Sequence, residues 1–128
     1  MTLQPLSKRA WILGTFALAL AVLIGAFGAH GLKSMVSAER LVTFETGVRY
    51  QFYHGFGILF LAIFHQLYGI KKMALSLHSF LAGILLFSFN CYLYVLTDIK
   101  VFAMIVPVGG VLFVVGWLNF FWNALKLR

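Results

Sequence analysis

Six polar residues lie within or just beside long apolar segments of this sequence, where a polar side chain is costly to bury. They are His30, Arg49, Tyr50, Gln51, His54 and Asn90. Histidine can carry a proton near neutral pH, and tyrosine and amide side chains can extend a hydrogen-bonded chain. Such residues suit a small-solute or proton pathway, since ionisable groups in apolar spans are often functional. The alternative is a polar layer that fixes helix order by hydrogen bonding alone.

Spacing separates these residues into two groups. Glu45 and Arg49 are four residues apart, so they can pair on one side of a helix. Tyr50, Gln51 and His54 fall on a different helical face. We therefore expect Arg49 to be held by Glu45 or to reach the membrane surface.

Catalytic and metal-binding patterns are not evident. His30 and His54 have no carboxylate or thiolate partner at ligand spacing, and the single cysteine, Cys91, has no partner thiol. The sequence has no nucleophile elbow, zinc-protease motif or phosphate-binding loop. We predict no cofactor, no metal and no enzymatic activity.

Four apolar runs must position these residues. They span residues 10–29, 48–70, 73–97 and 101–125, and each is long enough as a helix to cross about 30 Å of hydrocarbon. The sequence therefore predicts an all-α fold, a four-span transmembrane helix bundle forming a single domain over residues 1–128. A positively charged start before the first run resembles a signal peptide, but the run is too long for one.

Composition supports a membrane location. The chain is 62% hydrophobic and only 10% charged, which is too apolar for a water-soluble surface. Its net charge of +7 could indicate nucleic acid, yet the basic residues are scattered among the span ends. We expect membrane lipids as partners, with a homo-oligomer or another membrane protein possible in principle, and no nucleic acid.

The distribution of basic residues predicts orientation. With four spans, both termini and the middle loop share one side, which carries Lys8, Arg9, Lys71, Lys72, Lys126 and Arg128. The other side carries four basic residues and all three acids. Because cytoplasmic loops retain Lys and Arg, we predict both termini in the cytoplasm and a location in the bacterial inner membrane.

The first connection, residues 32–47, is polar. Ser37 precedes Glu39 and Arg40 in the manner of a helix N-cap, and apolar residues at helical spacing follow it. We predict a short outer amphipathic helix that runs into the second span. Histidines nearer the other side, His65 and His78, are expected at the membrane interface.

Small residues predict helix packing. Ala17, Ala21, Gly25 and Ala29 recur at intervals of four in the first run, a stripe that lets another helix approach closely. In the fourth run, Gly109 and Gly110 follow Pro107, which we expect to bend the helix. Counting residues from the outer side places His54, Asn90 and Pro107 at one depth, with His30 at the mouth.

Three blocks of sequence resemble a known family. They are residues 25–32 (GAFGAHGL), 47–54 (GVRYQFYH) and 107–110 (PVGG), with Gly116 and Trp117 beyond. In this order they resemble the YgdD/YwdK family of small bacterial inner-membrane proteins, which is related to eukaryotic transmembrane protein 256. The resemblance implies four spans and assigns no activity. Phe89, Asn90 and Cys91 stand where the family usually has small residues.

These observations lead to one hypothesis and two alternatives. We expect a non-enzymatic inner-membrane protein that acts through packing with lipid or protein partners. The first alternative is a small-solute or proton pathway using the outer polar layer, and an enzyme or redox-cofactor carrier is the second. An evident inverted repeat, common in secondary transporters, is missing from the sequence.

Overall fold

The computed structural model describes residues 2–127, and within this range the fold is helical without strands. Helix α1 (Pro5–His30) leads through the short 3-10 turn η1 (Leu32–Ser34) to α2 (Ala38–Tyr68). Next come α3 (Met73–Gly83), the π-helical stretch η2 (Ile84–Ser88) and α4 (Phe89–Thr97), which together form one continuous rod. Helix α5 (Lys100–Leu125) completes the chain. The prediction of an all-α fold is confirmed.

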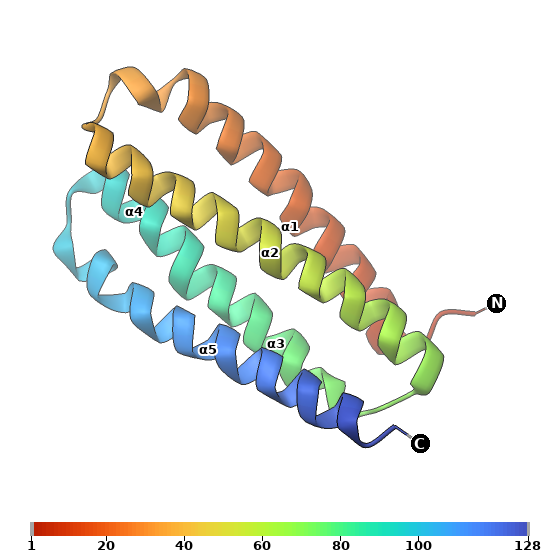
Figure 1. The fold of residues 1–128 in the computed structure, drawn as a ribbon. Coiled ribbons are helices and arrows are strands. Elements are labelled where there is room, and N and C mark those ends of the chain that lie inside the picture. Colours follow the sequence, from red (N-terminus) through yellow and green to blue (C-terminus); the bar gives the residue numbers. More distant parts are fainter. Residues whose placement is uncertain (1, 128) are drawn as a thin grey trace.

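The long helices run side by side along one axis (Figure 1). Helix α1 packs along α2, and α5 packs along the α3–η2–α4 rod, so α1 and α5 lie on opposite flanks. Both chain ends and the α2–α3 connection lie at one end, called here the terminal end. Turn η1 and the α4–α5 connection lie at the other, called the loop end.

Local sequence explains where the helices begin and end. The Ser37 side chain accepts a hydrogen bond from the Arg40 backbone N–H at 3.4 Å and so caps the start of α2. Gly69 ends α2 in the left-handed conformation at φ 64° and donates its N–H to the His65 carbonyl. Asp98 ends α4 in the same way at φ 59°. Helix α2 is unbroken from Ala38, so the segment predicted as an outer helix running into the second span forms the first turns of α2.

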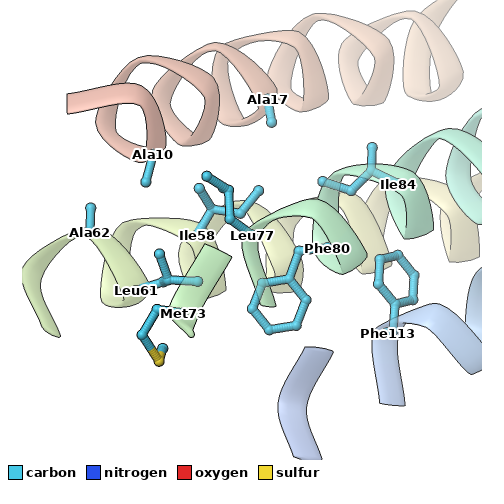
Figure 2. Packing of buried hydrophobic residues seen from close by; sticks show 10 residues of the cluster. All are labelled: Ala10, Ala17, Ile58, Leu61, Ala62, Met73, Leu77, Phe80, Ile84 and Phe113. Atoms are coloured by element: carbon cyan, nitrogen blue, oxygen red, sulfur yellow. The ribbon is translucent and has the colours of Figure 1, made fainter. Parts of the chain in front are cut away.

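Two buried clusters hold the helices together. The larger joins α1, α2, α3 and α5 and includes Ala10, Ile58, Leu77, Phe80 and Phe113 (Figure 2). The smaller lies at the loop end and joins Leu32, Phe44, Val48, Tyr92 and Val95. Small side chains from α1 let larger residues of α2 and α3 fill the space between them (Figure 2).

Large apolar side chains cover much of the outer surface. Phe16 of α1, Phe60 of α2 and Met104 of α5 are each more than 60% exposed. Three helical segments are long and apolar enough to cross a membrane: Pro5–Ser34, Met73–Thr97 and Lys100–Leu125. A surface of this kind suits a hydrocarbon solvent, where burial of apolar groups inside the protein gives no advantage.

Candidate functional site

Gln51 makes the central polar contact of the bundle. Its side chain is fully buried, and its amide nitrogen donates to the backbone carbonyl of Ala17 in α1 at 2.9 Å. Its amide oxygen accepts a hydrogen bond from the hydroxyl of Tyr92 in α4 at 2.8 Å. One side chain of α2 therefore joins two other helices. Both polar atoms of the buried amide therefore serve contacts between helices.

His54 lies one turn further along α2, in an aromatic enclosure. Its ring stacks on Phe113 of α5 with the ring centroids 3.4 Å apart, and Phe80 and Trp117 lie within 6.1 Å. The Nδ1 atom pairs with the Tyr50 carbonyl of its own helix at 2.7 Å. The side chain is only 5% exposed. The surroundings are those of a packed ring, since its close neighbours are aromatic.

The other predicted polar residues do not join these two in one network. Tyr50 is partly exposed and stacks on Phe87 with centroids 4.5 Å apart. Arg49 is exposed and donates to Thr46 Oγ1 at 3.1 Å, while Asn90 donates to the Leu85 carbonyl of its own rod at 3.1 Å. His30 is exposed at the end of α1. Of the six residues, Arg49, His54 and Asn90 bond within their own helix or rod, and Gln51 bonds to other helices.

The small residues of α1 form a stripe that differs from the predicted one. Its buried members are Ser7, Ala10, Gly14, Ala17, Ala21 and Gly28. Alternating steps of three and four keep these residues against α2, because seven residues nearly complete two turns. A constant step of four drifts around the helix by about 40° each time. Ala29 is accordingly exposed, and Gly25 is half-buried beside Val48.

Gly109 permits a close contact between the backbone of α5 and the backbone of η2. A Cβ atom at this position would lie only 2.7 Å from the Leu86 carbonyl carbon in η2. Gly110 has far more room, with nothing nearer than 3.8 Å. Pro107 is exposed within α5, which continues through it as one helix. Backbone of α5 and backbone of the π-helical stretch therefore meet at Gly109.

A second set of polar contacts at the terminal end was missed. His65 lies in the last turn of α2, and its place at the membrane interface stays a prediction, but its side chain is buried against α1 and pairs with Ser7 Oγ at 2.8 Å. The Gln66 side chain accepts from the Gln4 backbone N–H beside this pair. The signal was present in the spacing, since His65 follows Gln51, His54, Ile58 and Leu61 in alternating steps of three and four.

Helix α5 is joined to α3 by similar contacts. Ser76 Oγ donates to the Gly116 carbonyl at 2.8 Å, and the Asn119 amide donates to Ser76 Oγ at 2.7 Å. The same amide also donates to the Lys72 carbonyl at the start of α3. Polar residues in the terminal half of the bundle therefore serve helix contacts.

At the loop end, Arg40 and Asp98 form an ion pair, the one that occurs within residues 2–127. It connects the first turn of α2 to the α4–α5 connection, and the Arg40 guanidinium also lies 5.8 Å from the Tyr94 ring centroid. The predicted Glu45–Arg49 pair is not formed, since Arg49 bonds to Thr46.

Two open grooves mark the surface. One has a volume of about 310 Å³ between α1 and the α3–η2–α4 rod, and apolar residues such as Leu13, Phe16 and Leu85 line it with Gln51. The other, of about 250 Å³, lies between α1 and α2 near the loop end. In the part of the chain that the structure describes, no three His, Cys, Asp or Glu side chains are grouped to hold a metal ion.

Comparison with known proteins identifies the family. Residues 24–110 match the family described as "Protein of unknown function (DUF423)". A UPF0382 membrane protein of Staphylococcus saprophyticus is 40% identical over 116 residues, which cover 91% of this chain and 96% of the relative. The chain belongs to this family.

Further relatives come from Bacillus and Haemophilus. The UPF0382 membrane protein YwdK of Bacillus subtilis is 38% identical, with 90% of this chain and 93% of the relative aligned. A UPF0382 membrane protein of Haemophilus influenzae is also 38% identical, over 84% of this chain and 86% of its own length. No solved structure matches the fold. The resemblance to the YgdD/YwdK family is confirmed.

Proposed function

We propose that this family member is a four-span protein of the bacterial cytoplasmic membrane that acts through contacts with lipids and other membrane proteins and catalyses no reaction. A homo-oligomer is one form that such contacts can take. The single observation that carries the proposal is the use of Gln51, whose amide nitrogen and oxygen each bond to a neighbouring helix. A buried polar side chain in the middle of the bundle thereby serves helix packing.

Support for α2 as the fourth span comes from its outer face. Tyr53, Phe56, Phe60, Ile63 and Leu67 are all large, apolar and at least 45% exposed. Helix α2 also packs along α1 on one side and along the α3–η2–α4 rod on the other. If those neighbours cross the hydrocarbon layer, α2 must cross with them. Its first turns, with Glu39 and Glu45, then project at the outer interface.

Orientation is proposed from charge. Within residues 2–127, the terminal end carries five of the nine Lys and Arg residues and none of the three acids. Basic residues near span ends are retained in the cytoplasm. The termini are therefore assigned to the cytoplasm, and the loop end to the outer face of the membrane.

A solute or proton pathway is the competing function. A conducting path needs polar groups or water along the span. His54 instead has Phe80, Phe113 and Trp117 around its ring. This environment favours a structural role for His54.

Reconstitution in liposomes separates the two functions. Vesicles with a trapped pH-sensitive dye should show the same proton flux with the protein as without it. The His54→Ala variant should behave identically. Flux above the protein-free level that falls in His54→Ala would contradict the proposal and favour the pathway.

A further inference from the structure

A groove of about 250 Å³ opens between the last turns of α1 and the first turns of α2. Helix α1 contributes Gly25, Gly28 and Ala29, whose small side chains leave the space open. Phe44 and Val48 of α2 provide its apolar wall. Gly28 is already filled by Phe44, since a Cβ there would lie 2.7 Å from the Phe44 ring. The open volume therefore lies toward Gly25 and Ala29.

Two opposite charges border the same groove. Glu45 and Arg49 both line it and are both exposed. Residues at this spacing have Cβ atoms about 5–6 Å apart and pair readily on a helix. Here the Arg49 guanidinium donates to Thr46 instead of pairing with Glu45. The one ion pair within residues 2–127 is formed by Arg40 and Asp98. An anionic and a cationic group therefore remain available side by side.

The order of the charges along α2 gives the groove a direction. Helix α2 begins at the loop end, so Arg49 lies about 6 Å nearer the middle of the bundle than Glu45 at 1.5 Å per residue. A phospholipid with an ethanolamine headgroup has the same order. Its phosphate is next to the glycerol and the acyl chains, and its ammonium is further out. Val48 and Gly25 lie at the level of the two charges, so the glycerol and the acyl chains extend beyond Arg49 toward the middle of the bundle.

We propose that this groove binds a phospholipid whose headgroup contains a phosphate and a primary ammonium. Arg49 donates charge-assisted hydrogen bonds to the phosphate, and Glu45 accepts them from the ammonium. A free phosphate or a purely anionic headgroup satisfies Arg49 but is repelled by Glu45. The proposal rests on the proposed function, because it requires the loop end to lie at a membrane interface, and it names the lipid class involved.

Native mass spectrometry of the full-length protein from detergent tests the proposal. The probes are phosphatidylethanolamine, phosphatidylcholine and phosphatidylglycerol with the same acyl chains. Phosphatidylethanolamine should bind at least about fivefold more tightly than the other two. Glu45→Gln or Arg49→Gln should weaken this binding by about tenfold, the size of one charge-assisted contact. Ala29→Leu should also weaken it by occupying the groove.

A charge-swapped variant provides the strictest comparison. Glu45→Arg combined with Arg49→Glu keeps the net charge but reverses the order of charges, so the preference for phosphatidylethanolamine should disappear. Glu39→Gln and Lys100→Gln remove exposed charges outside the groove and should leave the preference unchanged. These controls separate the groove from general surface electrostatics.

Two results would overturn the lipid site. One is equal binding of all three lipids to the wild-type protein, or a preference that survives the charge swap. The other is a preference for phosphatidylglycerol that depends on Arg49 alone, which indicates an anion site. Insertion of the protein into lipid nanodiscs is measured in parallel. Insertion without headgroup preference overturns the lipid site only, whereas failure to insert overturns the four-span arrangement and the lipid site together.

Discussion

At the scale of single residues, the amide of Gln51 satisfies two demands of a lipid-solvated core. A buried polar group needs partners, and helices in hydrocarbon gain little from hydrophobic association. Gln51 supplies a donor to Ala17 and an acceptor to Tyr92, so helix contact and polar satisfaction coincide. Loss of either partner leaves a buried hydrogen-bonding group unpaired.

The Gln51–Tyr92 contact is tested by a double-mutant cycle. Gln51→Leu removes both hydrogen bonds and strands the Tyr92 hydroxyl, so it should lower the free energy of unfolding by about 1–3 kcal/mol. Tyr92→Phe should lower the free energy of unfolding by less, because it removes only the hydrogen bond from Tyr92 to Gln51. The double variant should be more stable than the sum of the single effects predicts, by roughly 1 kcal/mol. Reversible unfolding in detergent, followed by circular dichroism, measures all three. Simple additivity would contradict a direct contact.

The terminal-end contact between Ser7 and His65 gives a second residue-scale prediction. His65→Ala should lower the unfolding free energy by about 1–2 kcal/mol, because it removes a buried hydrogen bond and leaves a cavity. His78→Ala is the matched control, since His78 is exposed and bonds only to Ala74 of its own helix. Its effect should stay within about 0.5 kcal/mol. Equal effects in the same detergent unfolding assay would place His65 at the surface.

Sequence predicted which residues of α2 are polar at depth but not their partners. Counting residues from the end of each span placed His65 and His78 at similar depths. Whether each side chain is buried or exposed depends instead on the helical face that carries it. His65 shares a face with Ile58 and Leu61, which pack in the core, whereas His78 is exposed on α3. The Gln51 amide donates its hydrogen bond to the backbone carbonyl of Ala17. A backbone partner of this kind cannot be predicted from the pattern of side chains.

At the scale of elements, the π-helical stretch η2 and Gly109 of α5 belong together. An extra residue in one helical turn changes the backbone path and shifts the side chains that follow. Asn90 lies just after this stretch and bonds to the carbonyl five residues earlier, at Leu85. Gly109 packs directly on the η2 backbone at Leu86 and Phe87. The contact depends on the absence of a side chain on α5.

Paired glycine substitutions test this contact. Gly109→Ala should lower the free energy of unfolding by about 2–3 kcal/mol, because the added methyl group meets backbone, which cannot turn aside as a side chain can. Gly110→Ala adds the same methyl group with 3.8 Å of clearance and should be neutral or slightly stabilising. Thermal unfolding of the two variants in one detergent measures the difference. Similar melting temperatures would argue against the close approach of α5 to η2.

Helix positions were predictable because each apolar run has clear boundaries. The predicted runs at residues 73–97 and 101–125 coincide closely with the α3–η2–α4 rod and with α5. The π-helical stretch was not predicted, since its residues Ile84–Ser88 are ordinary helix formers in composition and the distortion arises where α5 packs closely against it. The predicted α1 stripe matches the buried one at Ala17 and Ala21 and departs from it at Ala29, because a four-residue interval was used where the contact follows a seven-residue repeat.

At the scale of the whole molecule, the bundle has an apolar exterior as well as an apolar core. Polar contacts between helices lie within the core, and the outer surface exposes large apolar side chains such as Leu23, Phe60 and Val111. Charges concentrate at the two ends, where the one ion pair of residues 2–127 also lies. Composition alone indicated this arrangement. The orientation of the bundle in the membrane is predicted from a different feature, the small difference in the number of Lys and Arg residues between its two ends.

Cysteine accessibility in intact cells tests insertion and orientation together. The natural Cys91 is the only cysteine and is buried, so Cys91→Ser provides a background for single new cysteines. In cells whose outer membrane is permeabilised, Ser37→Cys should react with a membrane-impermeant maleimide. Lys71→Cys should react only after the inner membrane is opened, because α2 separates the two positions. Lys100→Cys and Lys126→Cys are matched controls that should follow Ser37→Cys and Lys71→Cys respectively.

Each pattern of labelling has a distinct meaning. The expected pattern supports four spans with cytoplasmic termini. The reverse pattern keeps four spans but contradicts the orientation drawn from basic residues. If Ser37→Cys and Lys71→Cys react under the same conditions, α2 does not cross the membrane. In that case the exposed aromatic face from Tyr53 to Leu67 needs a protein partner rather than lipid, because so large an apolar surface is not stable in water.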